Sequence, residues 1–228
     1  MLKSKLLKLG VLISGRGSNL QALIDACALP GFPAQIVTVL SNKPDVQGLE
    51  RATAAAIPCG TVNHRAYPNR EAFELELDRQ LQAAGVELVC LAGFMRVLTP
   101  WFVERWRDRM INIHPSLLPS FPGVDTHARA LAAGVRFTGC TVHYVRPDVD
   151  AGPIILQAVV PVLPGDDPDT LAARVLQAEH RAYPFALRLI AEGRVTITGD
   201  RTEIAGHTAE ITFFLNPDDG LARRTASA

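Results

Sequence analysis

The sequence lacks several features that would set it apart from ordinary globular proteins. Its 23 basic and 23 acidic residues cancel, so there is no net charge, which argues against an extended surface for nucleic acid. It contains no run of the roughly 20 apolar residues that a membrane span needs. The apolar run near residue 11 is stopped by Ser14 and Gly15, too early for a secretory signal. We therefore expect a cytoplasmic protein that binds neither nucleic acid nor membranes.

The sequence also lacks the close cysteine and histidine spacings of a metal site. Cys27, Cys59, Cys90 and Cys140 lie tens of residues apart without a CxxC pair. His143 follows Cys140 by three residues in an expected strand, so the two side chains should point to opposite faces. We expect four reduced thiols and no metal.

Short apolar runs alternate with helical patterns along most of the 228 residues. This alternation is typical of βα units around a largely parallel sheet, and the length suffices for one well-packed domain. The sequence therefore predicts an α/β fold. The expected strands are 8–14, 35–41, 86–93, 109–113, 138–145 and 154–162, and the expected helices are 19–28, 48–56, 69–84 and 170–190.

The C-terminal part has a weaker pattern. "VTITGDRTEI" (195–204) is compatible with a hairpin, and the polar end that follows it is expected to fray. We expect one domain over 1–198 and a partly flexible extension over 199–228.

The first expected strand leads into a glycine-containing loop, "GRGSN". Gly15 and Gly17 would let backbone N–H groups approach an anion, and Ser18 or Asn19 could cap the next helix. A dinucleotide fingerprint would need a third glycine where Leu20 stands, and a Walker motif is absent. The loop therefore favours a monophosphate over NAD or ATP, while a tight turn without a ligand is the competing interpretation.

Polar side chains gather where two later strands end. Asn112 and His114 lie two apart and so share one strand face, and Asp148 and Asp150 follow the next strand. If the strand ends are neighbours, an Asp can hold the imidazole while the Asn amide stabilises an oxyanion. No Ser or Cys elbow accompanies them, so the trio favours direct acyl transfer to an amine. A capped loop histidine and a solvated Asp turn remain the alternatives.

Six segments in order resemble the folate-dependent phosphoribosylglycinamide formyltransferases. They are "LISGRGSNLQALIDA", "SNKPDVQGLERA", "LAGFMRVLTP", "NIHPSLLPSFPG", "TGCTVHYV" and "DAGPIILQ", and the similarity runs from about residue 8 to 194. The resemblance implies formyl transfer from 10-formyltetrahydrofolate to the amine of 5'-phosphoribosylglycinamide in purine biosynthesis. It also implies a Rossmann-like, mostly parallel sheet with helices on both faces.

The resemblance assigns the site residues by position. It places the ribonucleotide phosphate in the N-terminal half and the folate in the C-terminal half, with no metal, in a monomer or homodimer. The implied catalytic residues are Asn112, His114 and Asp150. The implied ribonucleotide contacts are Gly15, Arg16, Gly17, Ser18, Asn19 and Glu179, and the implied folate contacts are Arg70, Met95, Arg96, Val97, Leu98, Asn112, Arg146, Asp148 and Asp150.

Several of these assignments have an ordinary alternative. Met95, Val97 and Leu98 would by themselves indicate core positions. Arg70 and Glu179 resemble common helix charges, and Arg16, where relatives often have Asn, should point into solvent. Three other functions stay open, namely a formyltetrahydrofolate hydrolase, a methionyl-tRNA formyltransferase and a non-catalytic phosphosugar-binding protein.

Overall fold

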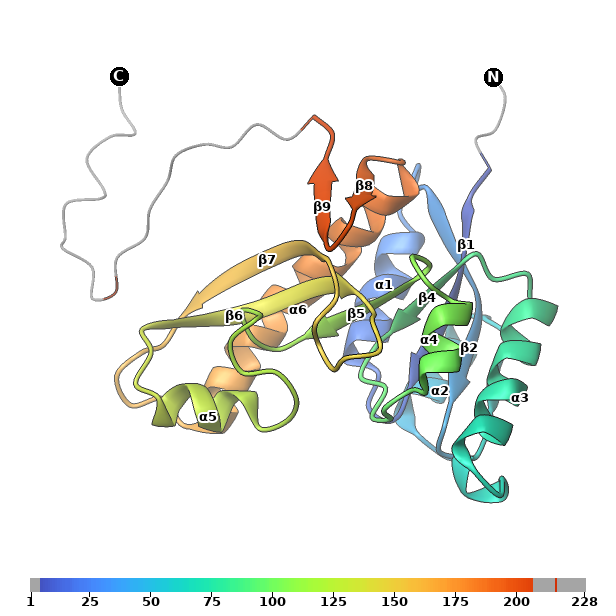
Figure 1. The fold of residues 1–228 in the computed structure, drawn as a ribbon, viewed down its shortest axis with the longest axis horizontal. Helices are drawn as coiled ribbons and strands as arrows, with labels where there is room; N and C mark the ends of the chain where they lie inside the picture. The colour runs from blue at the N-terminus through green and yellow to red at the C-terminus, as the bar shows by residue number, and fades with distance from the viewer. Residues whose placement is uncertain (1–4, 207–215, 217–228) are drawn as a thin grey trace.

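The computed structural model describes residues 5–206 and residue 216. Within this part, helices cover both faces of a seven-stranded sheet with the order β3-β2-β1-β4-β5-β6-β7 (Figure 1). The sheet strands are β1 (Leu7–Ile13), β2 (Ala34–Ser41), β3 (Cys59–Thr61), β4 (Leu88–Leu91), β5 (Met110–His114), β6 (Phe137–Tyr144) and β7 (Ile154–Pro161). The helices are α1 (Ser18–Cys27), α2 (Gln47–Ala54), the 3-10 helix η1 (His64–Ala66), α3 (Arg70–Ala83), α4 (Pro100–Arg105), α5 (Thr126–Ala132) and α6 (Pro168–Ala191).

The strand directions place a crevice at one edge of the sheet. Strands β1 to β5 are parallel, whereas β6 pairs antiparallel with both β5 and β7. The chain moves outward from β1 to β2 and β3, then returns to β4 on the other side of β1. Such a reversal opens a crevice at the carboxyl ends of the two central strands. The predicted α/β fold, with a mostly parallel sheet, is confirmed.

Two apolar cores, one on each face, hold the helices to the sheet. Helix α6 buries Leu171, Val175, Tyr183 and Leu187 against one face, at the spacing of a single helical stripe. The Tyr183 hydroxyl donates a 3.0 Å hydrogen bond to the backbone oxygen of Leu91 in β4. Helices α3 and α4 contribute to the core on the opposite face. Among the described helices, none is long and apolar enough to cross a membrane.

Besides the 3-10 helix η1, three short elements were not expected from the sequence. Strand β3 has three residues at the sheet edge, and α4 and α5 have six and seven residues. Segments this short do not complete enough turns or alternations to show a period. Helix α4 nevertheless has a local start signal, because Pro100 follows Thr99, whose side chain accepts from the Phe102 N–H.

The predicted hairpin is confirmed as β8 (Val195–Thr198) and β9 (Arg201–Ile204), which pair antiparallel. Its turn coincides with the expected domain boundary at 198. The Thr202 hydroxyl donates to the backbone oxygen of Ile154 at the start of β7, so β9 is attached to the sheet. Apart from Asn216, the remainder of the expected extension after residue 206 lies outside the described residues.

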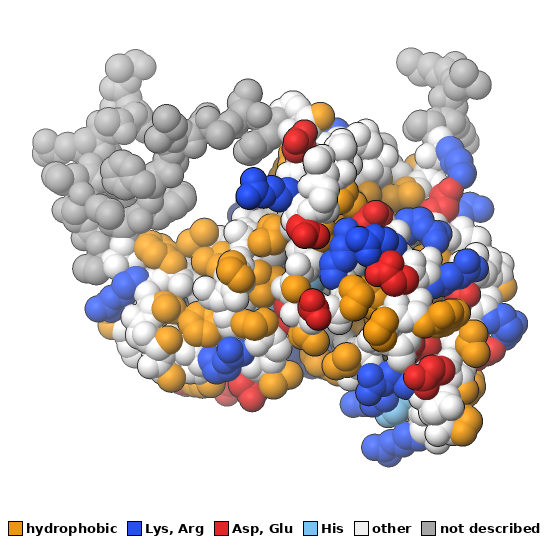
Figure 2. Space-filling model, in the orientation of Figure 1, with side chains coloured by type: hydrophobic (Ala, Val, Ile, Leu, Met, Phe, Trp, Pro, Cys, Tyr) orange, Lys and Arg blue, Asp and Glu red, His pale blue; other side chains and the backbone are white. Residues whose placement is uncertain are grey.

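The visible surface carries charges of both signs. Lys, Arg, Asp and Glu side chains are interspersed over α3, α4 and the hairpin, while hydrophobic side chains gather over β6, β7 and α5 (Figure 2). The exposed hydrophobic residues Met95 and Val97, in the loop after β4, adjoin the crevice at the carboxyl ends of the strands.

Candidate active site

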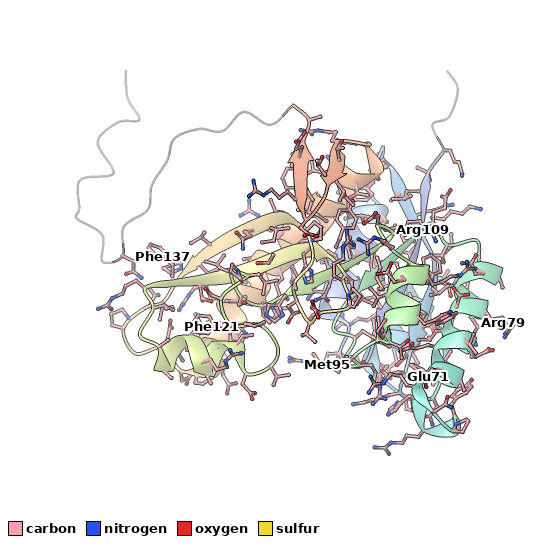
Figure 3. All side chains as sticks on the ribbon, in the orientation of Figure 1. Glu71, Arg79, Met95, Arg109, Phe121 and Phe137 are labelled. Carbon is pink, nitrogen blue, oxygen red and sulfur yellow. The ribbon has the colours of Figure 1, made fainter. Side chains whose placement is uncertain are left out.

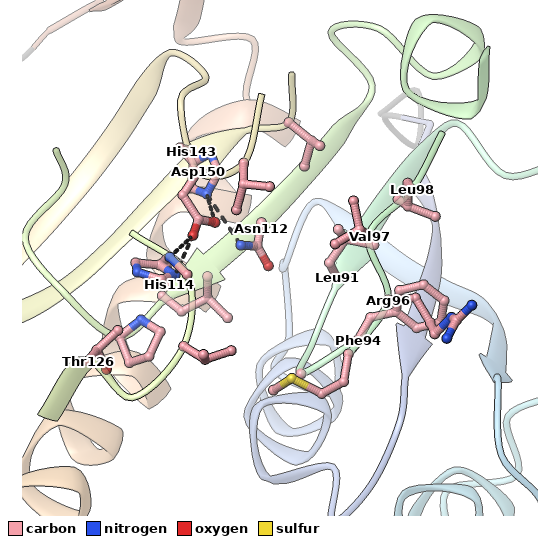
Figure 4. A pocket seen from close by; sticks show the side chains of 18 of the residues that line it. Leu91, Phe94, Arg96, Val97, Leu98, Asn112, His114, Thr126, His143 and Asp150 are labelled. Atoms are coloured by element: carbon pink, nitrogen blue, oxygen red, sulfur yellow. Dashed lines mark hydrogen bonds and ion pairs between the residues drawn. The ribbon is translucent and has the colours of Figure 1, made fainter. Parts of the chain in front are cut away.

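A pocket of about 500 Å³ occupies the crevice at the carboxyl ends of β4 and β5 (Figure 4). Its walls come from the loop after β4, the end of β5, the start of α5 and the loop between β6 and β7. The structure brings together in this lining the predicted residues Met95, Arg96, Val97, Leu98, Asn112, His114, Arg146, Asp148 and Asp150. The predicted ribonucleotide contacts and Arg70 are not part of this lining.

His114 is buried at the end of β5 and both of its ring nitrogens face acceptors. Its Nδ1 lies 3.2 Å from Oδ2 of Asp150, and its Nε2 lies 3.0 Å from the backbone oxygen of Phe121. Neither acceptor can donate a proton, so both contacts become hydrogen bonds only when each ring nitrogen carries hydrogen. The geometry therefore suits the imidazolium form, with the Asp150 carboxylate as its counter-charge.

Asp150 is fixed by the backbone around it. Its own φ is +55°, in the left-handed region that Asp tolerates better than most residues. Its Oδ2 also accepts a 2.8 Å hydrogen bond from the N–H of Gly123. Two residues later, a Cβ on Gly152 would stand 1.7 Å from the Tyr144 oxygen, so only glycine fits. The loop is thus shaped to aim this carboxylate at His114.

His143, which the sequence analysis did not identify, completes the polar cluster. Its Nδ1–H donates to the backbone oxygen of Tyr144 at 3.0 Å, which leaves Nε2 to accept from Nδ2 of Asn112 at 3.3 Å. Burial lowers the pKa of His143, with partial compensation from the Tyr144 oxygen and Asp150. A neutral His143 thereby fixes the Asn112 amide and leaves its second N–H available. The pairing depends on the β5–β6 register, which a single sequence does not show.

The loop after β4 presents apolar side chains to the pocket mouth. Met95 is 70% exposed and Val97 is 58% exposed, so their interpretation as core residues is wrong, whereas Leu98 is buried. Figure 3 shows Met95 on this loop and Phe121 on the loop that precedes α5. Exposed apolar side chains of this kind mark a surface suited to a flat or apolar ligand group.

Arg146 and Asp148 belong to the loop that carries Asp150. The Arg146 side chain is directed to the backbone oxygen of Val145 at 3.1 Å and to Oδ1 of Asp108 at 2.7 Å. It therefore braces this loop against the turn before β5. Asp148 lines the pocket from an exposed position.

The glycine loop lies beside the pocket, at the end of β1. Gly17, with φ of +70°, is the N-cap of α1, and no side chain caps the helix, so the expected capping by Ser18 or Asn19 is wrong. The first N–H groups of α1 thus remain available to an anion. A Cβ on Gly17 would stand 2.7 Å from the Cα of Gly48, so α2 also packs against this loop.

Asn19 and Glu179 form a buried pair next to this loop. Nδ2 of Asn19 donates to Oε2 of Glu179 at 2.7 Å, and Oδ1 of Asn19 is buried with no partner among the described residues. Burial raises the pKa of Glu179, and the bond from Asn19 partly offsets that shift. Arg16 is exposed, as expected, and its backbone oxygen accepts from Nε of Arg51 at 2.9 Å.

The last predicted contact, Arg70, begins α3 outside the pocket lining. Within the described part of the chain, no group of three or more His, Cys, Asp or Glu side chains is arranged to hold a metal ion.

The chain is similar in sequence and in fold to known proteins. The profile of the formyl transferase family matches residues 7–187. Phosphoribosylglycinamide formyltransferase of Escherichia coli K12 is 44% identical over 207 residues, covering 88% of this chain and 98% of that protein. The crystal structure of glycinamide ribonucleotide transformylase 1 from Symbiobacterium toebii superposes with a TM-score of 0.85 at 50% identity, covering 87% of this chain and 94% of that one.

A second group of relatives is much longer. The trifunctional purine biosynthetic protein adenosine-3 of Drosophila pseudoobscura is 55% identical over 195 residues, which cover 85% of this chain. The chain spans only 14% of the length of that protein.

Proposed function

The chain belongs to the formyl transferase family, and from that premise we propose that it is a phosphoribosylglycinamide formyltransferase. It would move the formyl group of 10-formyltetrahydrofolate to the amine of 5'-phosphoribosylglycinamide, yielding formylglycinamide ribonucleotide and tetrahydrofolate in purine biosynthesis. The observation that carries the proposal is the contact of His114 with Asp150, beside Asn112, in a pocket next to an uncapped helix N-terminus.

Each substrate has a region that suits its chemistry. The open N–H groups at the start of α1 suit the ribonucleotide phosphate, with Gly15, Arg16, Gly17 and Ser18 forming the loop around it. The unpartnered Oδ1 of Asn19 offers an acceptor to a hydroxyl or amine of the same substrate, next to Glu179. The exposed apolar residues Met95 and Val97, with the neighbouring Arg96 and Leu98, suit the flat pterin of the folate. The loop that carries Arg146, Asp148 and Asp150 would face it, and Arg70 would meet the acidic end of the folate.

The proposed reaction is a direct transfer. The amine nitrogen attacks the formyl carbon, and the carbonyl electrons move to oxygen, giving a tetrahedral oxyanion. The free N–H of Asn112 and the His114 imidazolium stabilise that oxyanion, with the substrate oxygen replacing Phe121 as the partner of Nε2. The oxyanion then re-forms the carbonyl while the bond to N10 breaks. A proton passes from the attacking amine to N10, and the Asp150 carboxylate holds the His114 ring in place.

The same trio could serve a hydrolase, with water in place of the amine. The uncapped start of α1 and the Asn19–Glu179 pair favour the transferase, because water needs no phosphate site.

A spectrophotometric assay distinguishes these functions. Purified protein is incubated with 10-formyltetrahydrofolate, or its 5,8-dideaza analogue, with and without the ribonucleotide. We expect deformylation that depends on the ribonucleotide and yields its N-formyl product. Deformylation at the same rate without the ribonucleotide would instead indicate a hydrolase, and ribonucleotide binding without turnover a phosphosugar-binding protein.

A further inference from the structure

A buried hydroxyl connects the end of β1 to the apolar wall of the pocket. Ser14 is the first residue after β1 and is 6% exposed. Its Oγ donates to Oδ1 of Asn42 at 2.6 Å and accepts from the N–H of Met95 at 2.7 Å. One hydroxyl thus makes one bond as a donor and one as an acceptor, to two segments that are far apart in the sequence.

Asn42, at the end of β2, is fully buried and itself well held. Its backbone oxygen accepts from Nδ1 of His64 at 2.8 Å. Its backbone N–H donates to the oxygen of Ile13 at 3.4 Å. A chain of hydrogen bonds therefore runs from the end of β2, through the end of β1, to the loop after β4.

The loop 93–98, which forms the apolar wall of the pocket, has few other hydrogen bonds, although the side chains of Phe94 and Leu98 pack into the core formed with α3 and α4. The N–H of Ala92 donates to the Leu12 oxygen, and the N–H of Thr99 donates to Glu74. Between them, Met95 is the one residue with a backbone hydrogen bond to the rest of the described chain. The exposed side chains of Met95 and Val97 add little packing of their own. Between the buried side chains of Phe94 and Leu98, the backbone of this wall is therefore held by the bond from Met95 to the Ser14 hydroxyl.

We propose that Ser14 is a positioning residue that holds loop 93–98 in its folate-binding conformation while leaving the ribonucleotide loop independent. The inference rests on the proposed function. The ribonucleotide loop is held by other bonds, from the Gly48 N–H to the Gly15 oxygen at 3.1 Å and from Nε of Arg51 to the Arg16 oxygen. Removing the Ser14 hydroxyl should consequently weaken the binding of one substrate and spare the other.

The chain offers a matched control in Ser41. It is fully buried at the end of β2, directly opposite Ile13 in the β1–β2 register. Its Oγ donates to the backbone oxygen of Lys43 at 2.7 Å and makes no hydrogen bond with Met95. Ser41→Ala therefore removes a buried hydroxyl from the same sheet edge without touching the folate wall.

The test compares Ser14→Ala with Ser41→Ala and wild type in the formyl-transfer assay. For Ser14→Ala we expect KM for 10-formyltetrahydrofolate to rise about tenfold, the scale of leaving a hydrogen-bonding group unpaired, with KM for the ribonucleotide within about twofold of wild type. Ser41→Ala should leave both KM values near wild type. Ser14→Cys nearly keeps the side-chain size and weakens the bond, so its folate KM should rise above that of wild type by less than about tenfold. This variant carries the test if Ser14→Ala fails to fold.

The outcomes separate the two proposals. An active wild type whose Ser14 variants raise the folate KM alone supports the positioning role. The positioning role is overturned if wild type is active and the Ser14 variants keep the folate KM, raise both KM values equally or match Ser41→Ala. The proposed function stays intact in each of these cases. A wild type without ribonucleotide-dependent transfer overturns both.

Discussion

At the scale of single residues, two histidines in one pocket have neighbours that suit opposite proton arrangements. His114 faces a carboxylate and a carbonyl, so its contacts suit the charged ring. His143 faces a carbonyl and the Asn112 amide, with Oδ1 of Asp150 at 3.8 Å, and its burial lowers its pKa, so its surroundings suit the neutral ring. The strand period predicted that Asn112 and His114 share a face, and both do line the pocket. Sequence analysis missed His143 because its partner lies across an antiparallel register.

The orienting role of His143 gives a prediction for substitution. In His143→Ala, Asn112 loses the acceptor that fixes its amide, so we expect kcat to fall about tenfold, less than the loss of an oxyanion donor itself. His143→Gln offers an alternative acceptor and should retain more activity. Steady-state kinetics at saturating substrates check both variants, and a wild-type kcat in His143→Ala would show that Asn112 needs no such partner.

At the scale of elements, the unit from β1 to α1 follows closely from its sequence, because a buried strand, two glycines and an amphipathic helix each give a clear local signal. The cap itself was predicted wrongly, since Gly17 rather than a polar side chain precedes α1. A helix that starts without a side-chain cap is less stable, but its first N–H groups remain available to a ligand. Elements α4, α5 and β3 escaped prediction because their short length hides their periodicity.

The two glycines of this loop should respond differently to alanine. Gly17→Ala places a Cβ at φ of +70° and 2.7 Å from the Cα of Gly48, so the free energy of unfolding should fall. A left-handed residue alone costs about 1–2 kcal/mol. A Cβ on Gly15 meets nothing within 4 Å, so the Gly15→Ala variant should have the same free energy of unfolding as wild type. Urea unfolding of the two variants checks the difference, and equal losses would contradict this description of the loop.

At the scale of the whole molecule, the site is assembled from segments that only the completed fold brings together. The reversal of strand order after β3, which places β4 beside β1, sets the glycine loop beside the apolar wall, and the antiparallel return through β6 brings Asp150 to His114. The sequence predicted the fold class from its alternating pattern. It could not place Ser14, Met95 and His143 relative to one another, because those contacts depend on strand order and register.

The pH dependence of the free energy of unfolding should report on the buried neutral His143. Burial lowers its pKa in the folded state below the ordinary value of about 6.5, so the unfolded chain binds the proton more readily. Its contribution to stability is therefore present above pH 6.5 and is lost as the pH falls toward the folded-state pKa. Urea unfolding at pH 7.5 and 5.5 should show a smaller pH-dependent loss in His143→Gln than in wild type. Equal losses would mean that His143 does not stay neutral in the fold.

The central claim is that the Asn112, His114 and Asp150 cluster performs formyl transfer, and one measurement tests it most directly. It is kcat for ribonucleotide-dependent transfer in His114→Ala and Asp150→Asn, with the binding of both substrates measured in parallel. We predict that both variants bind the substrates and lose kcat by about 10²–10³, the scale of one oxyanion donor. Turnover near that of wild type in both variants would contradict the account.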